Sequence, residues 1–375
     1  MTAVSSRPAR YAVATLFFVL GFNYGTWAAR LPALKDKFGL DPSQVGFLLL
    51  ASGLGAVFSF PVTAGVLRRL GARKACWIAS ALLPALLLAL GLAPSYDIAL
   101  LIMVAEGVVA ACFNVAMNAQ AVQVELRSGR AIMSRLHAVF SLGGLAAALV
   151  AAAAISLFKP VALHFLIAAV GMWSAAWWAG QRLLPLPPEP PAAAGLRFSL
   201  PSGAALWLGV AALCGTIIEG SMSDWSALYL KERTGASDAF APMGLACFAS
   251  AMLLARWLGD SWRTRWGSRR LLTWGGLLAG GGLGIGILVG GPIPALLAFA
   301  LVGVGIAAAS PCIYLAAARQ GPVALAAMTT TGSVGALLGP PLIGFVAHAS
   351  HLGWGLGCVA LAAGVIALAA RRIDW

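Results

Sequence analysis

Long apolar runs separated by short polar segments make up most of the chain. Each run is close to the ~20 residues that a helix needs to cross a bilayer. The runs lie at 11–30, 44–67, 75–92, 97–120, 136–157, 162–182, 204–227, 242–260, 271–290, 292–318, 323–347 and 351–370. Backbone groups find no water in lipid, and membrane barrel strands alternate over about ten residues, so these runs indicate helices. The pattern predicts an all-α integral membrane protein with twelve transmembrane helices.

A proline-rich segment separates two sets of six runs. Residues 183–203 contain the string LLPLPPEPPAAAGLRFSLPSG, and proline-rich segments act as semi-rigid spacers. We therefore expect an N-terminal six-helix half at 1–182, a cytoplasmic linker at 183–203 and a C-terminal six-helix half at 204–375.

The two halves repeat at an offset of 196 residues. The string LKDKFG at 34–39 aligns with LKERTG at 230–235, and LGARK at 70–74 aligns with WGSRR at 266–270. The glycine pairs that share this offset are Gly107 with Gly303 and Gly143 with Gly339. Two parallel six-helix repeats, with a solute site between them near the middle of the membrane, form a transporter architecture.

Composition and charge exclude the main soluble classes. Hydrophobic residues make up 61% of the chain and charged residues 10%, whereas soluble domains have about 25% charged residues. The net charge of +13 does not indicate nucleic acid binding, because the basic residues cluster between apolar runs. With both termini inside, 18 of the 25 Lys and Arg residues fall on the inner side and six on the outer. This bias predicts cytoplasmic termini and membrane lipid as the surroundings.

Two features resemble the major facilitator superfamily over nearly the whole chain. Residues 259–270 hold Gly-Asp followed by Arg-Trp-Gly-Ser-Arg-Arg, a stretched form of that family's G-x-L-x-D-R-x-G-R-R loop. Residues 339–344 hold a glycine-proline motif like that of the family's gating helices. The first-half loop at 68–74 lacks the family's acid, so a charge latch is not expected there.

Three further strings resemble the bacterial MosC-like subgroup of that family. They are NVAMNAQ at 114–120, SRLH at 134–137 and EGSMSDW at 219–225. The resemblance implies the major facilitator fold, a location in the bacterial inner membrane, and transport by alternating access of the two halves.

Polar residues inside apolar helices are costly and usually face a cavity or a partner. Two stripes repeat at spacings of i, i+3, i+4 and i+7 and share the 196-residue offset. The stripes are Asn23, Thr26, Trp27 and Arg30 in the first run and Glu219, Met222, Ser223 and Ser226 in the seventh. The family resemblance places both on the transport pathway. The alternative is that they join neighbouring helices.

Two intramembrane acids are candidates for proton coupling. Glu219 and Glu106 both lie within apolar runs. A carboxyl group that is protonated in one gate state and ionised in another meets the requirement of coupling. The alternatives are a fixed ion pair or a neutral hydrogen-bonded acid for Glu219, and a structural acid bonded to a neighbouring helix for Glu106.

Two asparagines one turn apart, Asn114 and Asn118, offer donors and acceptors suited to hydroxyl-bearing ligands. The offset places them opposite Ser310 and Tyr314, and a structural polar clamp is an equal alternative. The substrate-binding residues that we expect are Asn23, Trp27, Asn114, Asn118, Glu219, Ser223 and Tyr314.

The gate residues that we expect are Arg30, Asp224, His137, Asp260, Arg265 and Arg269. Arg30 lies near the outer end of its run, where snorkelling to headgroups is the favoured interpretation and an outer gate pair with Asp224 or Glu219 the alternative. His137 begins the fifth run, where a histidine satisfied within the gate region, or a cap, is the favoured interpretation.

The predicted function is secondary transport of a small polar solute, such as a sugar, a cyclitol or a related polyol or amine, coupled to protons. The alternatives are efflux of amphipathic drugs and a receptor or regulator that does not transport. No nucleophile elbow, ATP motif or cofactor box is present. We therefore expect no enzyme activity, no catalytic residues, no metal, no cofactor and no nucleic acid partner. The expected oligomeric state is a monomer.

Overall fold

The computed structural model describes residues 6–129, 132–158, 160–185, 204–320 and 322–375. These residues form only helices as regular structure. The helices are α1 (Ser6–Ala29), α2 (Leu31–Phe38), α3 (Pro42–Leu92), α4 (Tyr96–Ser128), α5 (Met133–Leu157), α6 (Val161–Gly180), α7 (Ala204–Thr234), α8 (Met243–Trp266), α9 (Ser268–Val289), α10 (Pro292–Ile306), α11 (Ala309–Gln320), α12 (Pro322–Ala349) and α13 (Leu352–Ala369).

The all-helical membrane prediction is confirmed. Among the described residues, 11 helical stretches are long and apolar enough to cross a bilayer, and a shorter apolar stretch at Met243–Gly259 occupies the position of the eighth predicted run. Most of the predicted linker, at 186–203, lies outside the described residues.

The helix boundaries differ from the sequence prediction in three places. The second and third runs merge into α3, interrupted only at Gly71, whose φ of 74° and ψ of 163° are not helical. Gly267, 196 residues later, makes the same turn between α8 and α9 with φ 76° and ψ 156°. A positive φ is accessible to glycine because it has no Cβ. The tenth run is divided into α10 and α11, and residues predicted to be an outer loop form α2.

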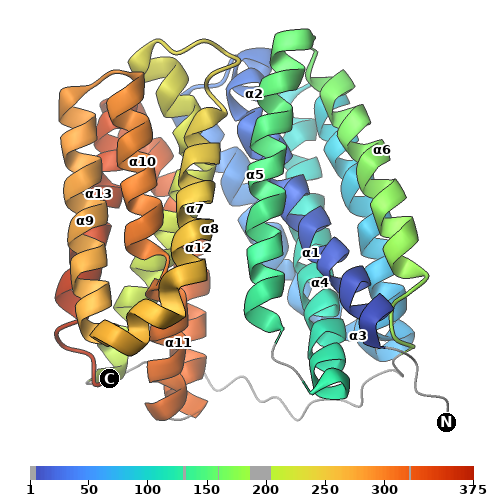
Figure 1. Ribbon diagram of the computed structural model, residues 1–375. Coiled ribbons are helices and arrows are strands. Elements are labelled where there is room, and N and C mark those ends of the chain that lie inside the picture. The colour runs from blue at the N-terminus through green and yellow to red at the C-terminus, as the bar shows by residue number, and fades with distance from the viewer. Residues whose placement is uncertain (1–5, 130–131, 159, 186–203, 321) are drawn as a thin grey trace. The chain divides into compact units, whose positions relative to one another are not determined.

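Two compact units make up the fold. One consists of the described residues within Met1–Leu34 and Ala51–Ala194, and the other of those within Lys35–Leu50 and Gly195–Trp375. In the first unit α1 packs against α5, and in the second α7 packs against α12 (Figure 1). These two pairs correspond through the 196-residue offset, so each unit builds its centre from equivalent helices.

Close helix crossings explain the repeated glycines. A Cβ on Gly107 of α4 would overlap the backbone carbonyl oxygen of Ser52 in α3. A Cβ on Gly303 of α10 would lie 2.5 Å from the carbonyl oxygen of Phe248 in α8. Phe248 follows Ser52 by the same 196 positions as Gly303 follows Gly107. Both crossings therefore require glycine because two backbones meet there.

Reciprocal ion pairs join Lys35–Leu50 to α7 within the second unit. Lys35 Nζ lies 2.7 Å from Glu232 Oε1, and Lys231 Nζ lies 2.5 Å from Asp36 Oδ2. The two lysines, and likewise the two acids, are 196 positions apart. These two ion pairs therefore join charged residues at equivalent positions of the sequence repeat.

A capping box starts α3. Asp41 Oδ1 accepts hydrogen bonds from the backbone N–H groups of Ser43 at 2.7 Å and Gln44 at 3.0 Å, and Gln44 Oε1 accepts one from the Asp41 N–H at 2.9 Å. The Ser43 hydroxyl donates to the same carboxylate oxygen at 2.6 Å. These donors favour the ionised form and hold the pKa of Asp41 below its usual value.

Candidate functional site

A buried carboxyl group lies between three helices of the first unit. Glu106 of α4 is 5% exposed. Asn23 of α1 donates to its Oε1 at 3.2 Å, and Ser52 of α3 donates to its Oε2 at 2.8 Å. Trp27, one turn after Asn23 on α1, is also buried, at 3% exposed. The arrangement can hold either an ionised or a protonated acid, since a hydroxyl can accept as well as donate.

All four residues of the polar stripe in the first run are buried in protein. Asn23, Thr26, Trp27 and Arg30 are each no more than 3% exposed. For Arg30, at 2%, this contradicts snorkelling into headgroups, because the guanidinium is enclosed by protein. Within the first unit it lies near His164 of α6. His164 is a buried histidine that the sequence analysis did not single out.

Glu219 of α7 makes an ion pair inside the second unit. Nη2 of Arg256 in α8 lies 3.1 Å from Glu219 Oε1 and donates to Oε2 at 3.2 Å. The Glu219 side chain is 39% exposed and that of Arg256 is 23% exposed. A guanidinium at this distance forms charge-assisted hydrogen bonds with a carboxylate. The geometry therefore favours the ion pair that the sequence left open for Glu219 as an alternative to coupling.

Removing one partner of this ion pair should lower the free energy of unfolding more than removing both partners. Arg256→Gln leaves the Glu219 carboxylate without its cation and is expected to lower the free energy of unfolding by about 1–2 kcal/mol, discounted for the partial exposure of the pair. Glu219→Gln with Arg256→Gln should recover part of this loss. A double-mutant cycle by thermal unfolding in detergent measures the coupling, and additive losses would contradict it.

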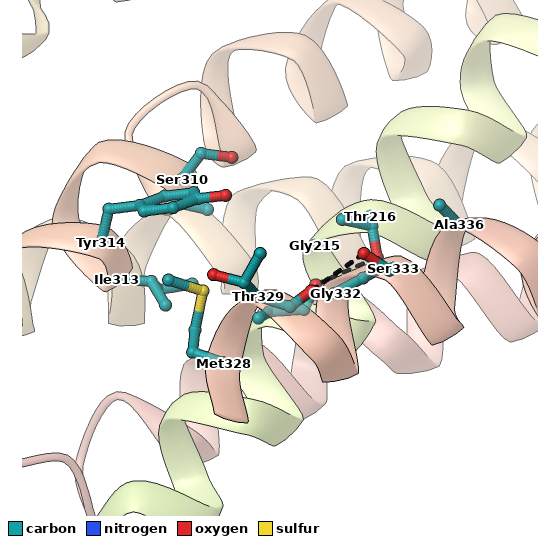
Figure 2. Close-up of a pocket in the computed structure, with 12 residues that line it drawn as sticks. Gly215, Thr216, Ser310, Ile313, Tyr314, Met328, Thr329, Gly332, Ser333 and Ala336 are labelled. Carbon is teal, nitrogen blue, oxygen red and sulfur yellow. Dashed lines mark hydrogen bonds between the residues drawn. The ribbon is translucent and has the colours of Figure 1, made fainter. Parts of the chain in front are cut away.

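A small cavity opens in the second unit between α7, α11 and α12 (Figure 2). Its volume is about 210 Å³. Five hydroxyl groups line it, and none of the described lining residues is charged. The hydroxyl-bearing residues are Thr216, Ser310, Tyr314, Thr329 and Ser333. Tyr314 was expected to bind substrate, and Ser310 was singled out as an equivalent of Asn114.

The five hydroxyl groups differ in whether they already donate a hydrogen bond within the protein. Thr216 donates to the backbone oxygen of Gly332 at 2.8 Å, and Ser333 donates to that of Thr329 at 3.0 Å. The side chains of Ser310 and Tyr314, which lie together on α11 in Figure 2, have no hydrogen bond to any other described residue. Their hydroxyls are therefore available to a solute.

Three further predicted substrate residues, Asn114, Asn118 and Ser223, bond within their own helices. Asn118 donates to Oδ1 and to the backbone oxygen of Asn114, both at 2.8 Å. The two amides therefore share one face of α4, where Asn114 is exposed. Ser223 donates to the backbone oxygen of Glu219 at 2.8 Å, which uses its proton within α7.

The predicted gate residues lie in different environments. Asp224 is 3% exposed, while His137, Arg265 and Arg269 are exposed. His137 packs edge-on against Phe17, with ring centroids 5.3 Å apart. Arg269 Nη2 donates to the backbone oxygen of Arg371 at 3.3 Å. The side chain of Asp260 lies outside the described part of the chain.

Several of the polar positions above were missed by sequence reasoning, among them Arg256, Ser52 and Thr216. Arg256 carried a usable signal, since a lone arginine within an apolar run needs a counter-ion. Ser52 and Thr216 carried none, because single hydroxyls are common in membrane helices and their partners lie far away in the chain.

Comparison with known proteins identifies the family. Residues 13–323 match the family model described as Major Facilitator Superfamily. An uncharacterized MFS-type transporter of Yersinia pestis is 35% identical over 364 residues, covering 95% of this chain and 94% of the relative. The membrane protein MosC of Rhizobium meliloti is 28% identical over 95% of this chain and 87% of its own length.

A solved structure supports the same fold. The crystal structure of a mutant of the nucleoside transporter NupG superposes with a TM-score of 0.73 at 16% identity, covering 97% of this chain and 98% of that one. The chain belongs to the major facilitator superfamily. It is a multi-pass membrane transporter of the MosC-like group with a small-molecule substrate, and its family is not one of enzymes.

Proposed function

We propose that the protein transports a small, uncharged polyhydroxylated solute, such as a sugar or a cyclitol. The observation that carries this proposal is the hydroxyl-lined cavity of the second unit, which has no charged group among its described lining residues. Hydroxyls both donate and accept, as the hydroxyls of a polyol do. The volume of about 210 Å³ is below the roughly 300–1,000 Å³ of pockets for drug-sized ligands, which disfavours bulky amphipathic drugs.

Proton coupling through Glu106 is the second part of the proposal. The support is a carboxyl group enclosed by three helices, with Asn23 and Ser52 as neighbours that accommodate either protonation state. Glu219 is assigned a lesser part, because Arg256 neutralises its charge. The proposed location is the bacterial inner membrane, which rests on the similarity to bacterial relatives. The proposed cytoplasmic position of both termini rests on the distribution of basic residues.

The solute class can be tested by ligand-dependent thermal stability of the purified protein. Neutral sugars and cyclitols should raise the unfolding temperature, while lipophilic cations should not. Tyr314→Phe and Ser310→Ala should each weaken the affinity about fivefold, the effect of losing one hydrogen bond. Tyr229→Phe is the control, because this tyrosine is buried against Phe299 and does not line the cavity. Stabilisation by lipophilic cations alone would replace the proposal with drug efflux.

A further inference from the structure

A hollow of about 340 Å³ lies at the start of α9 and is lined by three arginines. Arg269, Arg270, Thr273 and Trp274 come from α9, and Arg371 follows α13. None of the described residues that line the hollow is acidic. Three positive charges around one hollow repel one another, and a bound anion would offset that repulsion.

Hydrogen bonds and packing hold the Arg269 side chain and the backbone at Arg371 in place. Arg269 donates to the backbone oxygen of Arg371 at 3.3 Å, and Thr273 donates to that of Arg269 at 2.9 Å. The chain after α13 turns back on itself, with the Arg371 N–H bonded to the Leu368 oxygen at 3.1 Å. Ile373, two residues later, is 4% exposed and anchors this turn. The third arginine is thus positioned beside α9 by the fold.

The polar groups of the hollow match a phosphate. Guanidinium groups bind phosphate oxygens through paired N–H donors, and they are more weakly hydrated than ammonium groups. Arg269 and Arg270 occupy the first turn of α9, where the unpaired backbone N–H groups add partial positive charge.

An exposed apolar stripe leads away from the arginines along α9. Trp274, Leu278 and Ile285 are 69%, 40% and 64% exposed. Their spacing of i, i+4 and i+11 places them on one face of the helix. Tryptophan is enriched at the headgroup level of membranes, and α9 is long and apolar enough to cross one. A ligand that matches both features carries a phosphate and acyl chains.

We propose that this hollow binds the phosphate group of an anionic phospholipid, whose acyl chains lie along the stripe of α9. Basic pockets at the ends of membrane helices bind such headgroups. Arg73 and Lys74 of the first repeat stand at the positions equivalent to Arg269 and Arg270, so this pair offers a matched comparison.

The test compares three ligands by the thermal unfolding of the full-length protein in neutral detergent. Phosphatidylglycerol should raise the unfolding temperature by several degrees, whereas phosphatidylcholine with the same chains and inorganic phosphate should not. Arg270→Gln with Arg371→Gln should weaken the apparent affinity for phosphatidylglycerol roughly tenfold or more. Arg73→Gln with Lys74→Gln removes two charges at the repeat-equivalent loop and should leave the affinity nearly unchanged.

A second measurement needs no arginine variant. Brominated phosphatidylglycerol should quench tryptophan fluorescence more than brominated phosphatidylcholine does, and Trp274→Phe should remove part of that difference. Equal quenching by both lipids would overturn the proposal. So would a full shift produced by inorganic phosphate alone, or an affinity that falls equally in the two double variants.

Discussion

Replacing Glu106 by glutamine is expected to abolish uphill accumulation of the solute while leaving downhill exchange measurable. The amide has nearly the shape of the carboxyl group but does not titrate near neutral pH, so the proposed proton site is lost. The fold should tolerate the change because Asn23 Oδ1 has no partner among the described residues and can accept from the new amide. Concentrative uptake and counterflow of the solute identified by thermal stability, measured in the same proteoliposomes, separate the two activities.

The control for this variant is Asp97→Asn. It makes the same chemical change on the same helix, but Asp97 lies exposed in the first turn of α4. Uphill accumulation should survive there. If Glu106→Gln accumulates solute as the unaltered protein does, the proposed coupling is wrong and Glu106 is a structural acid that joins α4 to α1 and α3.

The second large effect is expected at the glycine crossings. Gly107→Ala should destabilise the protein by about 3 kcal/mol or more, because its Cβ would overlap a backbone oxygen that cannot move aside alone. Gly303→Ala should destabilise it less, since its Cβ would lie 2.5 Å from the carbonyl oxygen of Phe248. The measurement is the unfolding temperature in detergent, followed by size-exclusion chromatography.

Gly171→Ala in α6 is the matched control. Beyond its chain neighbours and the backbone of its own helix, no atom of the described residues lies within 4 Å of the Cβ that it would carry. Alanine loses less backbone freedom than glycine on forming a helix, so this variant should be unchanged or more stable by about 0.5–1 kcal/mol. If Gly171→Ala and Gly107→Ala lowered the stability equally, the close approach of Gly107 to Ser52 would not be the cause of the destabilisation.

Much of the fold follows from local sequence properties. Lipid denies the backbone any partner outside the helix, so a long apolar run has essentially one structure available. The internal repeat was also visible in the sequence. Gly71 with Gly267 and Gly107 with Gly303 recur at one offset, because each position has a steric requirement that only glycine satisfies. The predicted helix boundaries were less accurate. The second and third predicted runs are joined in α3, because the charged residues between them are compatible with a helix that continues into water.

The candidate site was only partly predictable. Glu106 and Glu219 stood out equally in the sequence as acids in apolar runs, yet one is paired with neutral donors and the other with Arg256. The partners of the two acids differ, and they come from helices 37 to 83 residues away along the chain. Spacing within one helix gives no information about such contacts.

The sequence by itself determined the helical membrane architecture, the internal repeat and the short list of polar residues within the helices, because each depends on the cost of placing single groups in lipid. Only the tertiary structure decided which of those residues meet. It brought Asn23 and Ser52 to Glu106, Arg256 to Glu219, and Arg371 to the start of α9. Hydrogen bonds and ion pairs act over a few ångströms, so their partners are set by how the helices pack and not by distance along the chain.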